Sequence, residues 1–338
     1  MPGTDVDKTS PEYLWSEPKM KEVIELWELT PSDTQKLFIL KAKLKNVHHL
    51  WNSPDVIMGF VSTGGWETAE QRFRKMIQWR LDNKVDALLT EFKPNPLILD
   101  NSCVAFLKNY DHQGDPIYLE RGGALDVKGL LKRFPREELM RHAIWLREVQ
   151  CNGAWLDEYE RRQGRGVRSI TVVYDLKDLS TRHLHPNVLG FFQELMQLTD
   201  DYYPGPIKRM IIIRAPHIFR FAWKTIKGFF SEESQSKMIF ADSDYLAELG
   251  KWMDVDVLPQ CINPDGHGET AIGMPKYMQG GQIPDHIGEG GVGYHAVGSG
   301  LSEASSPADD SSTDESASEE EVEQLMAGLH LTQVPAKA

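Results

Sequence analysis

The chain has 338 residues, of which 26% are charged and 41% hydrophobic, and no run of about 18 apolar residues occurs, so no transmembrane helix is expected. Of the formal net charge of −13, nine acids and one lysine after Gly300 contribute −8 and leave −5 on the body, which therefore lacks the basic excess that nucleic acid requires. The first residues also lack the basic start and apolar stretch of a signal peptide.

Residues 19–100 are predicted to form an all-helical N-terminal lobe. Residues 19–29 have helical apolar spacing, and so does the segment that follows Ser32, which can cap a second helix. Residues 54–92 indicate two more helices, interrupted at Gly64-Gly65, because glycine disfavours the interior of a helix.

Residues 101–262 have a different sequence pattern, in which apolar strand-like segments alternate with helical ones. The predicted strands are 116–121, 168–174, 208–214 and 237–240. Helices are predicted to begin near Pro135, Pro186 and Tyr245. Strands that alternate with helices form right-handed crossovers, so the sequence predicts an α/β fold with a largely parallel sheet flanked by helices.

The stretch from Lys208 to Phe230 is the most informative part of this region. Met210 to Ile213 form a short β-branched-rich run, which indicates a strand buried on both faces, and Pro216 ends it. One face of the helix predicted next is apolar, with Phe219, Ala222, Trp223, Ile226, Phe229 and Phe230. Another face carries Arg220, Lys224 and Lys227. Rings opposite cations suit a membrane interface, and a core-packed helix with a solvated basic face has the same pattern.

Residues 263–338 lose the regular pattern and are expected to be a Gly/Pro-rich linker followed by an acidic, disordered tail. Residues 319–331 could form a short helix, because four apolar residues recur there at helical spacing. These residues are Val322, Leu325, Met326 and Leu329. Such an element in a tail is better suited to docking on a partner protein than to folding alone.

The sequence contains neither a GxxxxGK[ST] phosphate-binding loop nor a GxSxG nucleophile elbow. His183 and His185 form an HxH pair, but no cluster of carboxylates or cysteines stands nearby, so a loop at a helix entry is expected rather than a metal site. The three cysteines are odd in number and far apart, which fits a reducing cytosol. Asp175 ends a predicted strand, where it could stabilise a turn or serve an α/β enzyme together with His183 or His185.

Four segments resemble a known family in their order and spacing. They are GDPIYLER at 114–121, VVYDLKDLS at 172–180, YYPGPIKRMIIIRAPHIF at 202–219 and FFSEESQSKM at 229–238. They resemble the CRAL-TRIO lipid-binding domain, nearest to its phosphatidylinositol/phosphatidylcholine-transfer branch, and WETAEQRFRKMIQWR at 66–80 resembles the helical region that precedes that domain. The resemblance covers residues 30–262 and implies a parallel sheet, a deep apolar cavity, and a mobile helix that closes the cavity and swings at membranes.

The resemblance assigns roles to individual residues of this chain. The gate helix would be Phe219–Phe230. Its membrane contacts would be Phe219, Arg220, Trp223, Lys224, Ile226, Lys227, Phe229 and Phe230. Lys237 matches the lysine that meets the inositol phosphate, and Ser234 matches a supporting hydroxyl. Ile170 and Val172 align with two hydroxyls that hold phosphocholine, whereas a one-residue slip would offer Ser169 and Thr171 and turn the other face inward. The expected cavity lining is Ile170, Val172, Tyr174, Ile211 and Ile213.

These features predict a protein that carries one lipid between membranes or presents it to lipid-modifying enzymes, without cofactor, metal or catalysed reaction. Phosphatidylinositol held through Lys237 is the favoured guest, because Ile170 and Val172 remove donors that phosphatidylcholine would need. The alternatives are a carrier of an apolar terpenoid such as a sterol, squalene or a tocopherol-like lipid, a lipid-switched adaptor with a protein partner at its tail, and the enzyme named above. The expected location is the cytoplasm, peripheral at organelle membranes.

Overall fold

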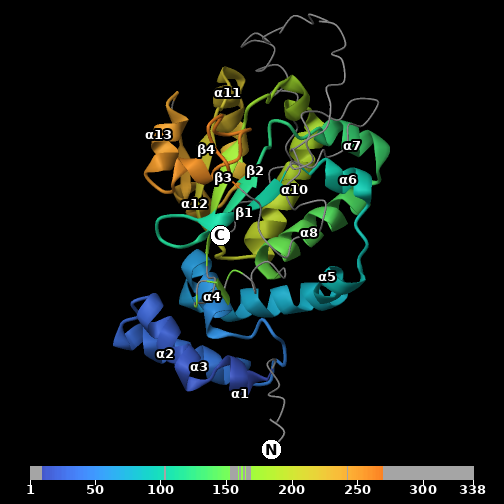
Figure 1. Ribbon diagram of the computed structural model, residues 1–338. Coiled ribbons are helices and arrows are strands. Elements are labelled where there is room, and N and C mark those ends of the chain that lie inside the picture. Colours follow the sequence, from blue (N-terminus) through green and yellow to red (C-terminus); the bar gives the residue numbers. More distant parts are fainter. Residues whose placement is uncertain are drawn as a thin grey trace, which may run out of the picture. The chain divides into compact units, whose positions relative to one another are not determined.

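The computed structural model describes residues 10–102, 104–152, 159, 161–162, 164, 169–241 and 243–268. They form two compact units (Figure 1). The helical unit comprises the described residues up to Glu91 together with Gln197–Pro206. The sheet unit comprises Phe92–Met196 and the described residues from Ile207 onward. The division therefore falls before the predicted boundary at residue 100, and ten residues from the middle of the chain belong to the helical unit.

The helical unit is built from short and long helices, whose starts are marked by proline residues and capping side chains. Its elements are α1 (Pro11–Leu14), α2 (Glu17–Leu26), α3 (Pro31–Leu44), α4 (Pro54–Asp82), the 3-10 turn η1 (Val85–Ala87) and α5 (Leu88–Glu91). The cap of α3 is Thr30, whose hydroxyl accepts from Asp33 N at 3.1 Å, rather than the predicted Ser32, because Pro31 takes the first helical position. In α4 the predicted interruption is confirmed, since Gly65 has φ +77°.

The residues at 197–206 are held in the helical unit by aromatic rings. Trp79 of α4 stacks on Tyr202 with ring centroids 4.2 Å apart and planes 2° from parallel. Tyr203 is buried and meets Trp51 edge-on at 6.3 Å. Gly59 lies so close to the backbone of Pro204 that an added Cβ would sit 2.8 Å from its carbonyl oxygen. The Tyr-Tyr-Pro segment therefore anchors the helical unit, a long-range pairing that local sequence patterns did not reveal.

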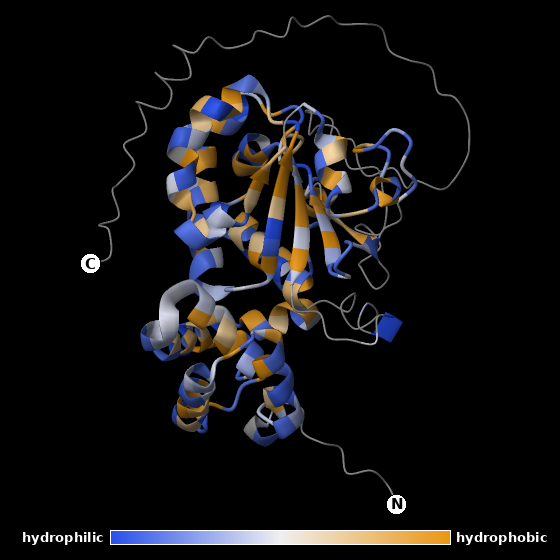
Figure 2. Ribbon diagram, turned by 90° about the vertical axis from the view of Figure 1, so that its left-hand side faces the viewer, coloured by the Kyte–Doolittle hydropathy of each residue, from blue (hydrophilic) through white to orange (hydrophobic). Residues whose placement is uncertain are grey.

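The sheet unit contains a five-stranded sheet in the order β1-β2-β3-β4-β5. The strands are β1 (Val104–Tyr110), β2 (Pro116–Glu120), β3 (Ile170–Asp175), β4 (Ile207–Ile213) and β5 (Met238–Phe240). Among the described strands, only the β1–β2 hairpin is antiparallel, and the remaining pairs are parallel. This confirms the predicted α/β fold with a largely parallel sheet, whose strands are mainly hydrophobic (Figure 2). Strand β1 was not predicted.

Helices cover both faces of this sheet. They are α6 (Pro96–Asp100), α7 (Val127–Arg133), α8 (Arg136–Asn152), η2 (Thr181–Leu184), α10 (Pro186–Tyr202), α11 (His217–Ile226), η3 (Lys227–Phe229), α12 (Glu232–Ser236), α13 (Tyr245–Gly250) and η4 (Val255–Val257). Helix α13 lies on one side of the sheet and α8 on the other (Figure 1). The predicted gate helix thus ends as an α-helix at Ile226 and continues as a 3-10 turn to Phe229.

The strand register divides the buried residues between two faces. On what we call the α13 face, Val173, Ile211 and Ile213 pack with Leu249 of α13 and with Leu258. On the opposite side lie the residues of the α11 face, where the partly buried Tyr174 and Met210 and the buried Ile212 cluster with Phe219 and Trp223 of α11. Since successive strand residues point to opposite faces, this register decides which residues can meet a ligand under α11.

The chain stays packed beyond the predicted domain boundary at residue 262. Asn263 is buried and donates from its side chain to Val255 O at 3.0 Å. His267 N donates to Asp256 O, and Gly268 N donates to Leu258 O. The packed part of the chain therefore extends at least to residue 268. The rest of the predicted linker and acidic tail, including the possible helix at 319–331, lies outside the described residues.

Candidate functional site

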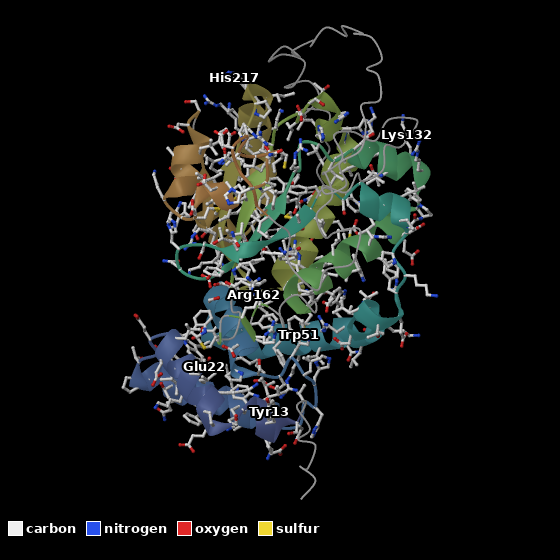
Figure 3. All side chains as sticks on the ribbon, viewed as in Figure 1. Tyr13, Glu22, Trp51, Lys132, Arg162 and His217 are labelled. Carbon is white, nitrogen blue, oxygen red and sulfur yellow. The ribbon has the colours of Figure 1, made fainter. Side chains whose placement is uncertain are left out.

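Helix α11 has the two-sided character that the sequence predicts. Phe219, Ala222 and Ile226 are buried, whereas Arg220 and Lys224 are exposed. The next cation and ring follow the same division, with Lys227 exposed and Phe229 buried in η3. His217, labelled in Figure 3, marks the start of the helix. Its apolar side packs toward the α11 face of the sheet, and its cations face away from that packing.

Trp223 lies at the centre of an aromatic cluster. Its ring is 5.7 Å from Phe219, 5.9 Å from Phe230 and 5.0 Å from Phe240, measured between centroids. Phe192 of α10 extends the cluster, at 5.8 Å from Phe230. Phe240 on the edge strand β5 is 45% exposed. The cluster therefore runs from the buried sheet face to the molecular surface at Phe240.

The two predicted headgroup residues lie together in and just after α12. Lys237 is the C-cap of this short helix, and its ammonium forms an ion pair with Glu233, one turn earlier. Ser234 accepts at its hydroxyl from the Ser231 hydroxyl at 3.0 Å. Both residues already have protein partners, so an anionic ligand would have to compete with Glu233 for the lysine.

The predicted cavity lining does not share one face of the sheet. Ile170, Val172 and Tyr174 alternate along β3 and lie on the α11 face, but Ile211 and Ile213 belong to the core on the α13 face. The prediction for Ile211 and Ile213 is therefore corrected: parity in β4 places Met210 and Ile212 on the α11 face instead.

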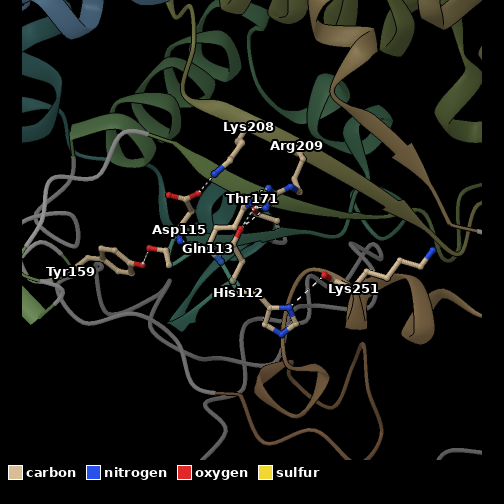
Figure 4. Close-up of polar contacts among 10 residues, drawn as sticks. His112, Gln113, Asp115, Tyr159, Thr171, Lys208, Arg209 and Lys251 are labelled. Atoms are coloured by element: carbon tan, nitrogen blue, oxygen red, sulfur yellow. Dashed lines mark hydrogen bonds and ion pairs between the residues drawn. The ribbon is translucent and has the colours of Figure 1, made fainter. Parts of the chain in front are cut away.

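The one-residue slip is also excluded for Thr171, which points to the α13 face. Its hydroxyl donates to Asp111 Oδ2 at 2.7 Å and accepts from Arg209 Nη1 at 2.9 Å. Arg209 also donates to Asp111 at 2.5 Å, and Lys208 pairs with Asp115 at 2.6 Å (Figure 4). This buried network ties the β1–β2 turn to β3 and β4. It holds the sheet together and offers no hydroxyl to a ligand on the α11 face.

Asp175 has a structural role in this fold. Its buried carboxylate accepts from Arg121 Nε at 3.2 Å and from Arg214 at 2.9 and 2.7 Å, and it accepts the backbone N–H of Lys177 at 3.0 Å. This is the turn-stabilising alternative predicted for the segment after β3. Arg214 also donates to Cys261 O at 2.9 Å, which ties the end of β4 to the C-terminal segment.

His183 lies in the 3-10 turn η2 and His185 follows it, directly before α10. His183 Nδ1 accepts from Ser180 N at 3.0 Å, so its Nε2 donates to Leu125 O at 3.0 Å. Desolvation and the nearby Arg182 charge lower the pKa of His183, which keeps the imidazole neutral. His185 Nδ1 accepts from Asn187 N. Within the described residues, no group of three or more His, Cys, Asp or Glu side chains could hold a metal ion.

Polar side chains that sequence reasoning missed lie on the α11 face. Glu120 of β2 pairs in register with Tyr174, and Tyr118 shares its face two residues earlier. Burial raises the pKa of the Glu120 carboxyl, against the opposing effects of the Arg147 charge and a hydrogen bond from Tyr118. Burial and the Glu120 charge raise the pKa of the Tyr174 hydroxyl. Strand parity alone would have grouped Tyr118, Glu120, Val172 and Tyr174.

Residues 100–263 match the family model described as the CRAL/TRIO domain. This segment of the chain is a CRAL/TRIO domain. The matched residues cover the strands of the sheet unit, helix α11 and the headgroup candidates. CRAL/TRIO domains bind lipids, so lipid binding is the activity that this part of the chain supports. No helix among the described residues is both long and apolar enough to span a bilayer.

Curated relatives and a solved structure extend this comparison. The chain is 27% identical over 266 residues to the Protein real-time of Drosophila melanogaster, covering 77% of this chain and 39% of that protein. It is 28% identical over 267 residues to the same-named protein of Drosophila pseudoobscura pseudoobscura, covering 77% and 38%. The chain thus spans about two-fifths of the length of these relatives. The crystal structure of Sfh5 resembles it with a TM-score of 0.48 and 16% identity, over 67% of this chain and 81% of that one.

Proposed function

We propose that this CRAL/TRIO protein binds a single lipid between the α11 face of its sheet and helix α11, and carries it between membranes. The observation that carries the proposal is the geometry of α11. Its apolar residues cover the sheet, its cations Arg220 and Lys224 are exposed, and the aromatic cluster leads from the interior to the surface. A helix of this kind can exchange packing against a lipid for insertion at an anionic interface.

Phosphatidylinositol is the guest that we propose first. Lys237 supplies a cation beside the edge strand β5, and Ser234 lies three residues before it. A lipid phosphate would replace Glu233 as the partner of Lys237, exchanging one charge-assisted contact for another. Ile170 and Val172 lie on the α11 face without a hydroxyl, which disfavours a second phosphate site for phosphatidylcholine.

A second candidate guest is an apolar terpenoid such as a sterol, squalene or a tocopherol-like lipid. The same Ile170 and Val172, both 2% exposed, favour it because they add apolar area where a phospholipid headgroup would need donors. In either case the protein would work in the cytoplasm and touch organelle membranes transiently.

A transfer assay tests these proposals. Donor vesicles carrying labelled phosphatidylinositol, phosphatidylcholine or a sterol are mixed with acceptor vesicles and the purified protein, and the rate of label movement is measured. The first proposal predicts that phosphatidylinositol moves faster than phosphatidylcholine, and the second predicts that the sterol moves fastest. A protein that accelerates none of the three would contradict the carrier function.

A further inference from the structure

The α11 face has a second polar region, distant from Lys237. It consists of Tyr118 and Glu120 of β2, Tyr174 of β3, and Arg147 and Gln150 of α8. Lys237 leads into β5, which is three strands away from β2 in the sheet order. At a spacing of about 4.8 Å between neighbouring strands, the two regions are roughly 14 Å apart. A single phosphate therefore cannot occupy both.

Helix α8 contributes a connected pair of polar side chains to this region. Arg147 donates through Nη1 to the Gln150 side-chain oxygen, one turn along the helix. The Arg147 charge also acts on the Glu120 carboxyl across the space between α8 and β2. Glu120, Arg147 and Gln150 thus form a line of interacting polar side chains, with a charge interaction between Glu120 and Arg147 and a hydrogen bond between Arg147 and Gln150.

Gln150 ends this line with an unused donor. Its side chain is buried, with 3% of the residue exposed. Its oxygen accepts from Arg147, but its Nε2 has no hydrogen-bond partner in the described part of the chain. A buried amide N–H without an acceptor is costly, at about 1–3 kcal/mol, so native proteins rarely keep one without a purpose. A ligand oxygen would supply the missing acceptor.

The charges of the region decide what kind of oxygen fits. Burial penalises charge in this region, as the raised pKa values of the Glu120 carboxyl and the Tyr174 hydroxyl indicate. A phosphate would bring a further charge that is costly to desolvate, whereas an uncharged oxygen would not. We propose that Gln150, Arg147 and Glu120 form a site for one uncharged oxygen of the bound lipid, either a hydroxyl or an ester carbonyl.

This proposal rests on the lipid-carrier function and specifies its guest. It predicts selection for a lipid oxygen that binds at the end of the α11 face far from Lys237. A hydrocarbon such as squalene would leave Gln150 Nε2 unpaired, and an ether-linked phospholipid would offer only ether oxygens, which accept hydrogen bonds more weakly than an ester carbonyl does. A sterol would present its hydroxyl, and a diacyl phospholipid would present an ester carbonyl.

Matched lipid pairs that differ only in a hydroxyl or in their ester carbonyl oxygens test the proposal. Binding of cholesterol is compared with that of cholest-5-ene, and diacyl with dialkyl phosphatidylinositol, for the unaltered protein, for Gln150→Met and for the control Gln71→Met at an exposed position of α4. Methionine keeps the length of glutamine and removes the amide. In at least one pair, Gln150→Met should lower the affinity for the member with the hydroxyl or ester carbonyl about tenfold and change the affinity for the other member much less.

The stability of the lipid-free protein separates a ligand role from a structural one. Gln150→Met should leave the melting temperature of the lipid-free protein equal to or above that of Gln71→Met, because the substitution removes an unpaired donor. A several-degree fall in melting temperature, with equal losses for both members of each pair, would overturn the inference and leave the carrier function standing. Uptake of no lipid by the unaltered protein would instead overturn the carrier function itself.

Discussion

Lys237 and Glu233 form an ion pair within one helical turn, and an anionic lipid must displace the carboxylate to reach the lysine. Lys237→Ala should therefore lower the affinity for phosphatidylinositol about tenfold. The variant loses a charge-assisted hydrogen bond to the lipid phosphate, but this loss is partly offset because the lysine already has Glu233 as a partner in the lipid-free protein. Lys251→Ala is the matched control, since Lys251 also pairs with a glutamate on a short helix. Equilibrium binding to vesicles of both variants checks the prediction, and an equal loss for an uncharged lipid would show that Lys237 is structural.

Ile170 and Val172 lie on the α11 face at the positions where the related branch has hydroxyls. Introducing Ser at one and Thr at the other should raise phosphatidylcholine pickup, because each hydroxyl adds a donor for phosphate. The double variant should also lose roughly 2–5 kcal/mol of stability, since buried apolar groups are removed. Pickup is measured from labelled vesicles. Equal binding of phosphatidylcholine and phosphatidylinositol by the unaltered protein would refute the exclusion.

His142 on α8 gives the sheet unit a sensitivity to acid. It is 2% exposed, and its Nε2 accepts from Asn95 N at 2.7 Å. Burial lowers the pKa of this imidazole from 6.5 to about 4. The unfolded chain therefore binds the proton more readily, so stability is complete above pH 6.5 and falls as the pH drops toward 4, by up to about 3 kcal/mol.

Urea unfolding at a series of pH values measures this loss. A His142→Phe variant keeps an aromatic ring and cannot bind a proton, so its stability should vary less between pH 6.5 and 4. A variant that loses as much stability as the unaltered protein over this range would assign the acid sensitivity to other groups.

At the scale of elements, strong local signals were sufficient for most of the sheet unit. Apolar runs predicted the strands at 170–175 and 207–213 within a few residues. In the helical unit, the glycine pair predicted the break at Gly65. Strand β1 was missed because its apolar half is followed by polar residues and no alternation marks it. Ile211 and Ile213 of β4 were misassigned to the cavity lining because β4 is apolar on both faces, so its sequence does not indicate which face meets a ligand.

Helix α11 is the element whose charges can be changed without touching the core. Reversing Arg220, Lys224 and Lys227 to Glu should weaken binding to anionic liposomes about a hundredfold or more, at about 1 kcal/mol for each cation lost. Transfer should slow in parallel, while a lipid already bound should stay bound. Reversing the exposed Lys21, Lys45 and Lys93 gives the same change in net charge and serves as the control. Normal transfer by the α11 variant would remove this helix from the membrane-contacting role.

At the scale of the whole molecule, the two units do not follow the order of the sequence, because a segment from the middle of the chain belongs to the helical unit. Residues 197–206 leave the sheet unit at the end of α10, join the helical unit, and return to begin β4. The pairing of Trp79 with Tyr202 links residues that are far apart in the sequence, so no local pattern could predict it. The Glu120–Arg147–Gln150 line is missed for the same reason, because β2 and α8 are brought together only by the fold.

The central claim is that the folded protein holds one lipid molecule. Native mass spectrometry of the full chain, purified from cells and again after incubation with mixed vesicles, tests it most directly. The account predicts a single adduct that fragmentation identifies as an oxygen-bearing lipid, with phosphatidylinositol favoured over phosphatidylcholine. Protein that carries no lipid in either preparation, while its circular dichroism shows an intact fold, would contradict the claim.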